Sequence, residues 1–562
     1  MHHSISIVLS GEAGQGLQII EEFLVETLAR ETYVFSSKEV MSRVRGGNNS
    51  VEIRISDQPI HALRYTIDAL FLLNDHALDR LRPRLVDSTL VYGEESFLTE
   101  EVKSALTFHP IRMTELAKQS GNRLFVNTVL FGYIAGLLDI DTTNAHDVIS
   151  RRFEKRGVET VEGNLKAFEL GYAQAKADPH LLPRIKPVDF KPKKIFTGND
   201  AIVAGALAGG VNYLSAYPMS PGTGVMMALA EKGSEYGVLV EQAEDEIAAL
   251  NMVQGAWYAG ARAMTTTSGG GFALMTEAVS LAGITETPAV IHVAQRPGPA
   301  TGLPTRTEQA DLNLVVYAGH GEFPRVVYAP GTIEDGVELA ARAFWMADKY
   351  QIPVFLLSDQ YYLESMVPAA PTLPKNYLES FIVKTDAEYQ RYKLDPSGLS
   401  PRGIPGYGNG FVKVDSDEHD ESGAITESFD MRIKMHEKRL HKEVLLHVDA
   451  VEPLEVGAKT AKNLLIGWGS TFGVLQEYVL THPEADFSLI HLRQVYPLPV
   501  VLEEKIKTAR SVVVVENNAT GQLANLIQAT FGIKLANRIL KYNGEPFHID
   551  ELEARLAEVN HA

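Results

Sequence analysis

Three consecutive motifs decide the fold: YPMSP at 217–221, VEQAEDEIAALNMVQGAWYAGAR at 240–262 and TTTSGGG at 265–271. The two prolines of YPMSP stiffen a turn after an expected apolar strand and leave Ser220 few alternative conformations. A second strand, an acidic turn and a helix from Glu246 onward then follow. In open parallel sheets ligands bind at the edge where the strands end. The stretch therefore predicts the ligand-facing edge of an α/β domain.

The helix after the acidic turn is predicted to be buried, because its apolar residues recur at helical spacing. An acidic residue that opens a helix usually complements the helix dipole in solvent. Taken alone, Glu241, Glu244 and Glu246 therefore each have an ordinary interpretation as a solvated cap. The motifs elsewhere in the chain decide whether one of them has a chemical role.

Further motifs follow in a fixed order along the chain. They are GEAGQG at 11–16, RGGNNS at 45–50, QRPGPATGLPTRTEQADL at 295–312, GHGEFPR at 319–325, SPRGIPG at 400–406 and DEHDESGAITES at 417–428. Together with the first three motifs, this order resembles the alpha subunit of the 2-oxoacid:ferredoxin oxidoreductases with a gamma domain fused at its N-terminus. The similarity is greatest to the 2-oxoglutarate type.

The resemblance implies thiamine diphosphate-dependent oxidative decarboxylation of a 2-oxoacid, with 2-oxoglutarate expected, to acyl-CoA and CO2. Electrons would pass through a [4Fe-4S] cluster on a beta subunit to ferredoxin, and the reaction could also run in reverse. The beta subunit would also hold Mg2+ and the diphosphate of the coenzyme. The expected assembly is a dimer of alpha-beta heterodimers. Two alternatives stay open: a non-redox thiamine enzyme of the transketolase or decarboxylase type, and a non-catalytic assembly subunit.

By the same resemblance, Glu246 is the glutamate that hydrogen-bonds the ring nitrogen of the coenzyme's aminopyrimidine. Glu241 and Glu244 lie near enough to be the true counterpart, and the spacing to the Gly-Ala pair of the helix favours Glu246. Tyr217, Pro218 and Met219 would line the coenzyme.

Substrate recognition calls for cations, since an arginine fork matches a planar carboxylate. Arg296 and Arg306 lie on a Gly/Pro-rich loop expected at the same sheet edge as Ser220. The family's motif reads YPITP and its threonine binds substrate; Ser220 keeps the hydroxyl and Met219 replaces isoleucine. Arg45 resembles the basic position beside the far end of the substrate, which in 2-oxoglutarate is a second carboxylate.

Composition excludes several classes of protein. The formal net charge of -19, with no long basic run, argues against nucleic-acid binding. No apolar stretch approaches the length of a membrane span, so the sequence predicts a cytoplasmic protein. There is no cysteine, which excludes a cysteine-ligated cluster in this chain and predicts that the iron lies on a partner. No metal-binding residue is expected in this chain.

The predicted fold class is a multidomain α/β protein. A gamma-like domain is expected at 1–185, a parallel-sheet thiamine pyrimidine-binding domain at 194–370, a polar connector that wraps a partner at 371–452, and a domain like the C-terminal domain of transketolase at 453–562. The glycines of GEAGQG favour close strand–helix packing, with anion binding at a helix N-terminus as the open alternative. His419 and the pair Asn517 and Asn518 are read as structural, although a functional role stays open for each.

Overall fold

The computed structural model describes residues 4–41, 47–178, 182–189 and 194–561. Their contacts divide the chain into two compact units. Unit 1 comprises Met1–Phe196, Glu364–Ala370 and Phe547–Ala562, and unit 2 comprises Thr197–Leu363 and Pro371–Pro546. Among the described residues, no helix is both long enough and apolar enough to cross a bilayer.

Unit 1 contains an eight-stranded mixed sheet in the order β6-β5-β4-β1-β3-β2-β14-β7. Its strands are β1 Ser4–Glu12, β2 Tyr33–Glu39, β3 Asn48–Ser56, β4 Ala69–Leu72, β5 Leu90–Gly93, β6 Thr107–Pro110, β7 Lys194–Thr197 and β14 Met366–Ala369. Its helices are α1 Leu17–Leu28, α2 Glu100–Ser104, α3 Met113–Gln119, α4 Val126–Leu137, α5 Thr142–Phe153, α6 Val158–Lys176 and α19 Ile549–His561. In the GEAGQG turn, a Cβ on Gly16 would overlap Asn127 of α4, so close packing requires this glycine.

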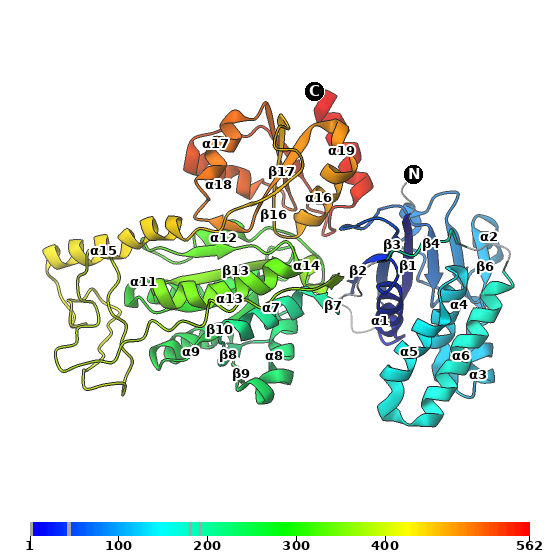
Figure 1. Ribbon diagram of the computed structural model, residues 1–562, viewed down its shortest axis with the longest axis horizontal. Coiled ribbons are helices and arrows are strands. Elements are labelled where there is room, and N and C mark those ends of the chain that lie inside the picture. Colours follow the sequence, from blue (N-terminus) through cyan, green and yellow to red (C-terminus); the bar gives the residue numbers. More distant parts are fainter. Residues whose placement is uncertain (1–3, 42–46, 179–181, 190–193, 562) are drawn as a thin grey trace. The chain divides into compact units, whose positions relative to one another are not determined.

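The first sheet of unit 2 has seven strands in the order β18-β12-β13-β11-β10-β8-β9 (Figure 1). Its strands are β8 Tyr213–Ala216, β9 Leu239–Gln242, β10 Ala263–Ser268, β11 Ala289–Gln295, β12 Val326–Tyr328, β13 Pro353–Asp359 and β18 Gln494–Tyr496. All its neighbouring pairs are parallel except β12 with β18. Helices before and between these strands are α7 Gly198–Ala208, α8 Thr223–Tyr236, α9 Glu246–Tyr258, α10 Gly269–Leu274, α11 Thr276–Thr285, α12 Leu312–Val316 and α13 Ile333–Tyr350, and α14 Gln360–Glu364 follows β13.

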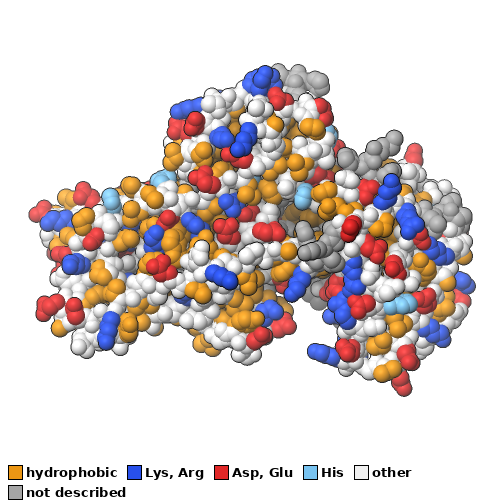
Figure 2. Space-filling view, in the orientation of Figure 1, with side chains coloured by type: hydrophobic (Ala, Val, Ile, Leu, Met, Phe, Trp, Pro, Cys, Tyr) orange, Lys and Arg blue, Asp and Glu red, His pale blue; other side chains and the backbone are white. Residues whose placement is uncertain are grey.

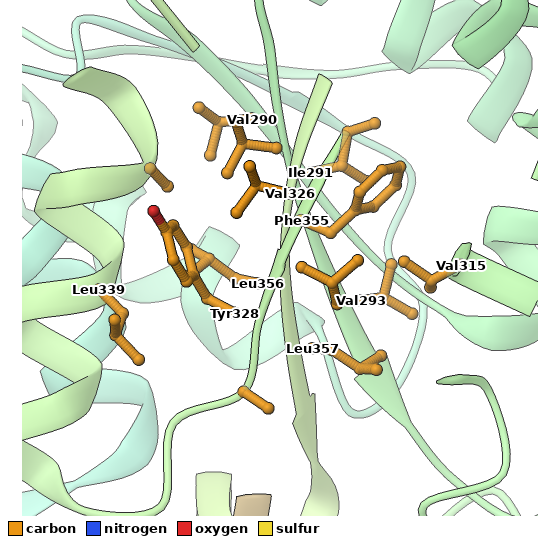
Figure 3. Packing of buried hydrophobic residues seen from close by; sticks show 14 of the residues in the cluster. Val290, Ile291, Val293, Val315, Val326, Tyr328, Leu339, Phe355, Leu356 and Leu357 are labelled. Carbon is orange, nitrogen blue, oxygen red and sulfur yellow. The ribbon is translucent and has the colours of Figure 1, made fainter. Parts of the chain in front are cut away.

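The central strands β11, β12 and β13 of this sheet are buried on both faces. Successive residues of a strand point to opposite faces, as Val290 and Ile291 do in Figure 3. Leu339 of α13 covers one face and Val315 of α12 lies on the other. Fully buried strands explain why the sequence here has continuous apolar runs such as AVIHVA rather than an alternating pattern.

The second sheet of unit 2 has five strands in the order β15-β17-β16-β19-β20. Its strands are β15 Leu454–Val456, β16 Asn463–Trp468, β17 Phe487–Leu492, β19 Ser511–Glu516 and β20 Asn537–Leu540, with helices α16 Phe472–Thr481, α17 Val501–Thr508 and α18 Gln522–Phe531. Residues 371–428 contain only isolated bridges before α15 Phe429–Val448 begins. The multidomain α/β class is therefore confirmed, whereas the four domain boundaries stay predictions.

Candidate functional site

Four chain segments meet at one edge of the seven-stranded sheet. Because β8, β9, β10 and β11 run parallel and in register, their carboxyl ends lie together. The YPMSP turn follows β8, α9 follows β9, the glycine turn 269–271 follows β10, and Arg296 follows β11 directly. The sequence predicts a ligand-facing edge at these strand ends, and the four segments lie together there in the fold.

Glu246 opens α9, as the sequence predicted. The preceding Asp245 is the N-cap, and its carboxylate accepts a hydrogen bond of 2.7 Å from the backbone N–H of Ala248. Glu246 is therefore not needed as a cap. It is 3% exposed, whereas Glu241 and Glu244 are exposed to solvent. This difference favours Glu246 over the two alternatives for a role in a water-excluded site.

The Oε1 atom of Glu246 is buried and has no hydrogen-bond partner among the described residues. It faces Gly271, where an added Cβ would lie 2.6 Å from Oε1. A buried carboxylate oxygen without a donor is costly, typically by about 1–3 kcal/mol. The arrangement is therefore that of an acceptor held ready for an N–H donor from outside the chain.

The hydroxyls of β10 add to this polar surface. Thr265, Thr267 and Ser268 each have a buried hydroxyl oxygen without a partner among the described residues. Thr266 differs, because its hydroxyl donates to the carbonyl of Gly222 at 3.0 Å and lies 2.8 Å from Nδ1 of His292. Burial lowers the pKa of His292 to about 3, so this imidazole is neutral at pH 7. It is a satisfied core group rather than an acid–base catalyst.

Arg296 joins the end of β11 to the YPMSP turn. The side chain is 7% exposed, and its Nη1 donates to the backbone carbonyl of Ser220 at 2.7 Å. Its Nη2 lies 3.6 Å from the sulfur of Met219, and its Nε is buried without a partner among the described residues. Burial lowers the pKa of this guanidinium. Two of the sequence-predicted site residues, Ser220 and Arg296, are therefore in direct contact.

The other predicted residues are placed less closely. Tyr217 and Pro218 are exposed on the turn, where a ligand or another chain can reach them. Arg306 lies on the long loop after β11, and a Cβ on Gly544 would lie 3.3 Å from its Cβ. Arg45 lies outside the described residues.

The residues read as structural from the sequence are bound internally. The carbonyl oxygen of the Asn518 side chain accepts from the N–H of Gly521 at 2.8 Å, and the Asn517 amide donates to the carbonyl of Lys541 at 2.9 Å. His419 is fully buried against the ring of Tyr392 at a centroid distance of 3.8 Å. Burial lowers its pKa. These contacts support the structural interpretation of all three residues.

Two buried glutamines near the site, Gln295 and Gln309, were not predicted from the sequence as site residues. Gln295 donates from Nε2 to the carbonyl of Ser358 at 3.2 Å and accepts from the backbone N–H of Asp311 at 3.0 Å. Gln309 donates to the carbonyl of Trp468 at 2.7 Å and thereby links the loop to the five-stranded sheet. Both glutamines are fully buried. The only sequence signal was their place within the motif 295–312.

Comparison with known proteins identifies the class. Residues 204–438 match the family described as pyruvate flavodoxin/ferredoxin oxidoreductase, thiamine diphosphate-binding, and residues 6–174 match pyruvate ferredoxin/flavodoxin oxidoreductase. The first match spans the edge described above. The fold and the site thus define a thiamine-binding chain of the ferredoxin-linked oxidoreductases.

Similarity to individual proteins extends over the whole chain. The chain is 30% identical to a 2-oxoacid:ferredoxin oxidoreductase subunit alpha from a Sulfolobus species, covering 99% of this chain and 97% of the relative. It is 27% identical to the 2-oxoglutarate oxidoreductase subunit KorA of Mycobacterium tuberculosis, covering 99% and 93%. A solved 2-oxoglutarate:ferredoxin oxidoreductase from Magnetococcus marinus, with 2-oxoglutarate, coenzyme A and succinyl-CoA bound, superposes with a TM-score of 0.91 at 31% identity over 99% of both chains. The chain therefore belongs to the 2-oxoacid:ferredoxin oxidoreductase alpha subunit family.

Proposed function

We propose that this chain is the catalytic alpha subunit of an enzyme that oxidatively decarboxylates 2-oxoglutarate to succinyl-CoA and CO2. The observation that carries the proposal is the buried, unpartnered Oε1 of Glu246 at the first turn of α9. The names of the Mycobacterium and Magnetococcus relatives support 2-oxoglutarate as the 2-oxoacid.

Thiamine diphosphate fits the polar edge of the sheet. Its aminopyrimidine presents N–H donors and a ring nitrogen, and Glu246 supplies the acceptor that such a ring needs. When bound, the coenzyme supplies a carbanion that adds to the carbonyl of the 2-oxoacid. Glu246 would share a proton with the pyrimidine ring nitrogen of the bound coenzyme, and the apolar body of α9 would keep water from the carboxylate. Tyr217, Pro218 and Met219 line this coenzyme site.

Arg296 is proposed to bind the 1-carboxylate of the substrate. Its guanidinium is anchored on one side by the carbonyl of Ser220, which leaves its buried Nε as an uncommitted donor. The hydroxyl of Ser220 lies on the same turn. Arg306 and Arg45 are proposed for the remainder of the substrate, including the second carboxylate of 2-oxoglutarate.

Further parts of the enzyme are proposed to lie on a beta subunit. These are Mg2+, the diphosphate site and the [4Fe-4S] cluster that passes electrons to ferredoxin. The chain has no cysteine, and the described residues contain no cluster of metal-ligating side chains.

We further propose a dimer of alpha-beta heterodimers in the cytoplasm. In Figure 2, acidic and basic side chains are mixed over the visible face, with no broad basic area for nucleic acid.

The test is to co-express the chain with its partner subunit and add 2-oxoacid and coenzyme A to the purified complex with a viologen dye. We expect a brown complex that reduces the dye with 2-oxoglutarate in preference to pyruvate and branched 2-oxoacids. Replacing Glu246 by Gln keeps the shape of the side chain, so the complex should assemble while turnover falls on the order of a hundredfold or more. Wild-type turnover in this variant would remove Glu246 from the mechanism.

The two alternatives have their own outcomes in the same assay. A non-redox thiamine enzyme would release CO2 from a 2-oxoacid without reducing the dye. A non-catalytic assembly subunit would give activity that is independent of both Glu246 and Arg296. Arg296→Lys keeps the charge but loses the planar fork, so it should raise the KM for the 2-oxoacid.

A further inference from the structure

Asp311 is a charged group at the site that the proposed function does not use. It lies at the end of the loop after β11, where its backbone N–H donates to Oε1 of Gln295 at 3.0 Å. Gln295 is the residue immediately before Arg296. The loop from 297 to 310 therefore closes on itself and holds Asp311 beside the start of the loop that carries Arg296.

The carboxyl group of Asp311 is wedged against the glycine turn. A Cβ on Gly269 would lie 2.5 Å from its Oδ1 and even closer to its Oδ2, so only glycine leaves room for this carboxyl. Its Oδ2 is buried and has no hydrogen-bond partner among the described residues. On the same turn, Gly271 faces Glu246. The turn 269–271 thus separates two carboxyl groups, each with one buried oxygen that has no donor among the described residues.

The groups that face Asp311 carry more negative than positive charge. Arg296, the residue after β11, is a cation whose charge lowers the pKa of Asp311. The half-buried Glu308, in the same segment as Asp311, is an additional carboxyl group close to it. Behind the glycine turn lies Glu246. The neighbouring α10 and α12 carry no titratable side chain, and α18 contributes the neutral Gln522, which donates to the carbonyl of Ala310 at 2.7 Å.

A substrate carboxylate bound to Arg296 would bring one more negative charge into this group. One guanidinium would then face that carboxylate as well as Asp311. At a partly buried site, a like charge disfavours ionisation of its neighbour, and the least costly response is uptake of a proton. Burial already raises the pKa of Asp311 to about 6, although Arg296 acts in the opposite direction.

We propose that Asp311 is the counter-charge of Arg296 in the free enzyme and takes up a proton when the carboxylate of the 2-oxoacid binds that arginine. This inference rests on the proposed function of Arg296. Asp311 is a positioning residue: its charge balances Arg296 before substrate arrives, and its protonation releases the full charge of the guanidinium to the substrate. Binding is thereby linked to one proton.

Linkage fixes the expected pH dependence. Below the pKa of Asp311 in the free enzyme the group is already protonated, so the KM for the 2-oxoacid does not change with pH for this reason. Above that pKa each binding event consumes a proton, and the KM rises towards a limit of about tenfold per pH unit. The rise ends at the higher pKa of Asp311 in the substrate complex.

Glu308 is the matched control. It lies three positions before Asp311, and its replacement by Gln removes the same negative charge. Burial, and then the charge of Asp311, raise the pKa of Glu308 to about 7. It is therefore the other group that could take up the proton. Asp311 is favoured because its Oδ2 is buried without a hydrogen-bond partner among the described residues and the charge of Arg296 acts on it, whereas Glu308 is only half-buried.

The experiment uses the complete complex with its partner subunit. Proton uptake is measured by calorimetry at pH 7 in two buffers of different ionisation enthalpy, with N-oxalylglycine as a non-decarboxylating analogue of 2-oxoglutarate. We expect wild type and Glu308→Gln to take up at least half a proton, and Asp311→Asn to take up almost none. The KM of Asp311→Asn should stay within about twofold between pH 7 and 8, where that of wild type rises several-fold.

Three results would overturn the proposal: no uptake in wild type, uptake that persists in Asp311→Asn, or uptake lost in Glu308→Gln alone. Absence of uptake in wild type overturns the proposal even if a variant does not fold, and thermal unfolding checks both variants. Failure of the proposed function looks different, because then the analogue gives no binding heat and no 2-oxoacid supports dye reduction.

Discussion

The clearance at Gly271 gives a direct test of the site without removing any functional group. In Gly271→Ala the new Cβ would lie 2.6 Å from Oε1 and 2.9 Å from Cγ of Glu246. Ordinary van der Waals contact begins at 3.4 Å, so the carboxylate oxygen must move by about 0.8 Å. The Cβ would also overlap the hydroxyl of Thr267. Both side chains are buried, which limits the directions in which they can yield.

A displacement of this size should be large in kinetic terms. A catalytic group misplaced by about 1 Å can lose on the order of a hundredfold in rate. We therefore expect turnover of the Gly271→Ala complex to fall by roughly ten- to a hundredfold, with weaker binding of thiamine diphosphate. Turnover is followed by viologen reduction with saturating 2-oxoacid, coenzyme A and coenzyme, and coenzyme binding by fluorescence titration of the complex.

Gly255 is the matched control, because it lies within α9 and a Cβ there would meet nothing within 4 Å. Alanine is the better helix former, so Gly255→Ala should keep full activity and gain up to about 1 kcal/mol of stability. Unchanged turnover and coenzyme affinity in Gly271→Ala would show that Glu246 does not work from the position described.

Three further predictions concern two buried carboxyl groups and the YPMSP turn. Glu286 binds Lys438 and Lys442 at 2.6 Å each, and these lysines hold its pKa below the ordinary range against the effect of burial. Glu286→Gln leaves two buried ammonium groups unpaired, and urea unfolding should show a loss of about 3–5 kcal/mol. In unit 1, burial raises the pKa of Glu21 from 4.5 to about 7, which means that the folded state binds a proton between these values that the unfolded state has released. The contribution of Glu21 to the stability of unit 1 should therefore be greatest below pH 4.5 and fall by up to about 3 kcal/mol as the pH rises through 7. Glu21→Gln should remove that pH dependence in thermal unfolding. In the turn, Ser220→Ala leaves the backbone carbonyl that holds Arg296, so the KM for the 2-oxoacid should rise less than in Arg296→Lys; a larger rise would assign the main contact to the Ser220 hydroxyl.

Much of the parallel sheet and its ligand-facing edge was predictable because short-range signals specify them. The prolines of YPMSP, the apolar runs and the capped acidic helix start are properties of neighbouring residues. Parallel strands then bring their ends together without further information. For this reason the sequence alone places Ser220, Glu246 and Arg296 at one edge of the sheet.

Other parts of the site depend on contacts between residues far apart in sequence, and no local pattern encodes them. The bond from Gln309 to Trp468 joins positions 159 residues apart. Asp311 matters because of the space left by Gly269, which a sequence pattern does not reveal. The choice of Glu246 over Glu241 and Glu244 rested on resemblance and spacing in the sequence, and the burial of one carboxylate and exposure of the other two give it a physical reason.

The polar connector also contacts the C-terminal end of α9. Arg402, in the SPRGIPG motif, donates to the carbonyl of Trp257 at 3.2 Å and to Asp348 of α13 at 2.5 Å. A cation at the last turn of a helix stabilises its free carbonyls, and here it also fixes that end of α9 to α13. Glu246 is at the opposite end of the same thirteen-residue helix. Because a helix is stiff, we expect this anchor to help hold the carboxylate in place from about 17 Å away, at a rise of 1.5 Å per residue.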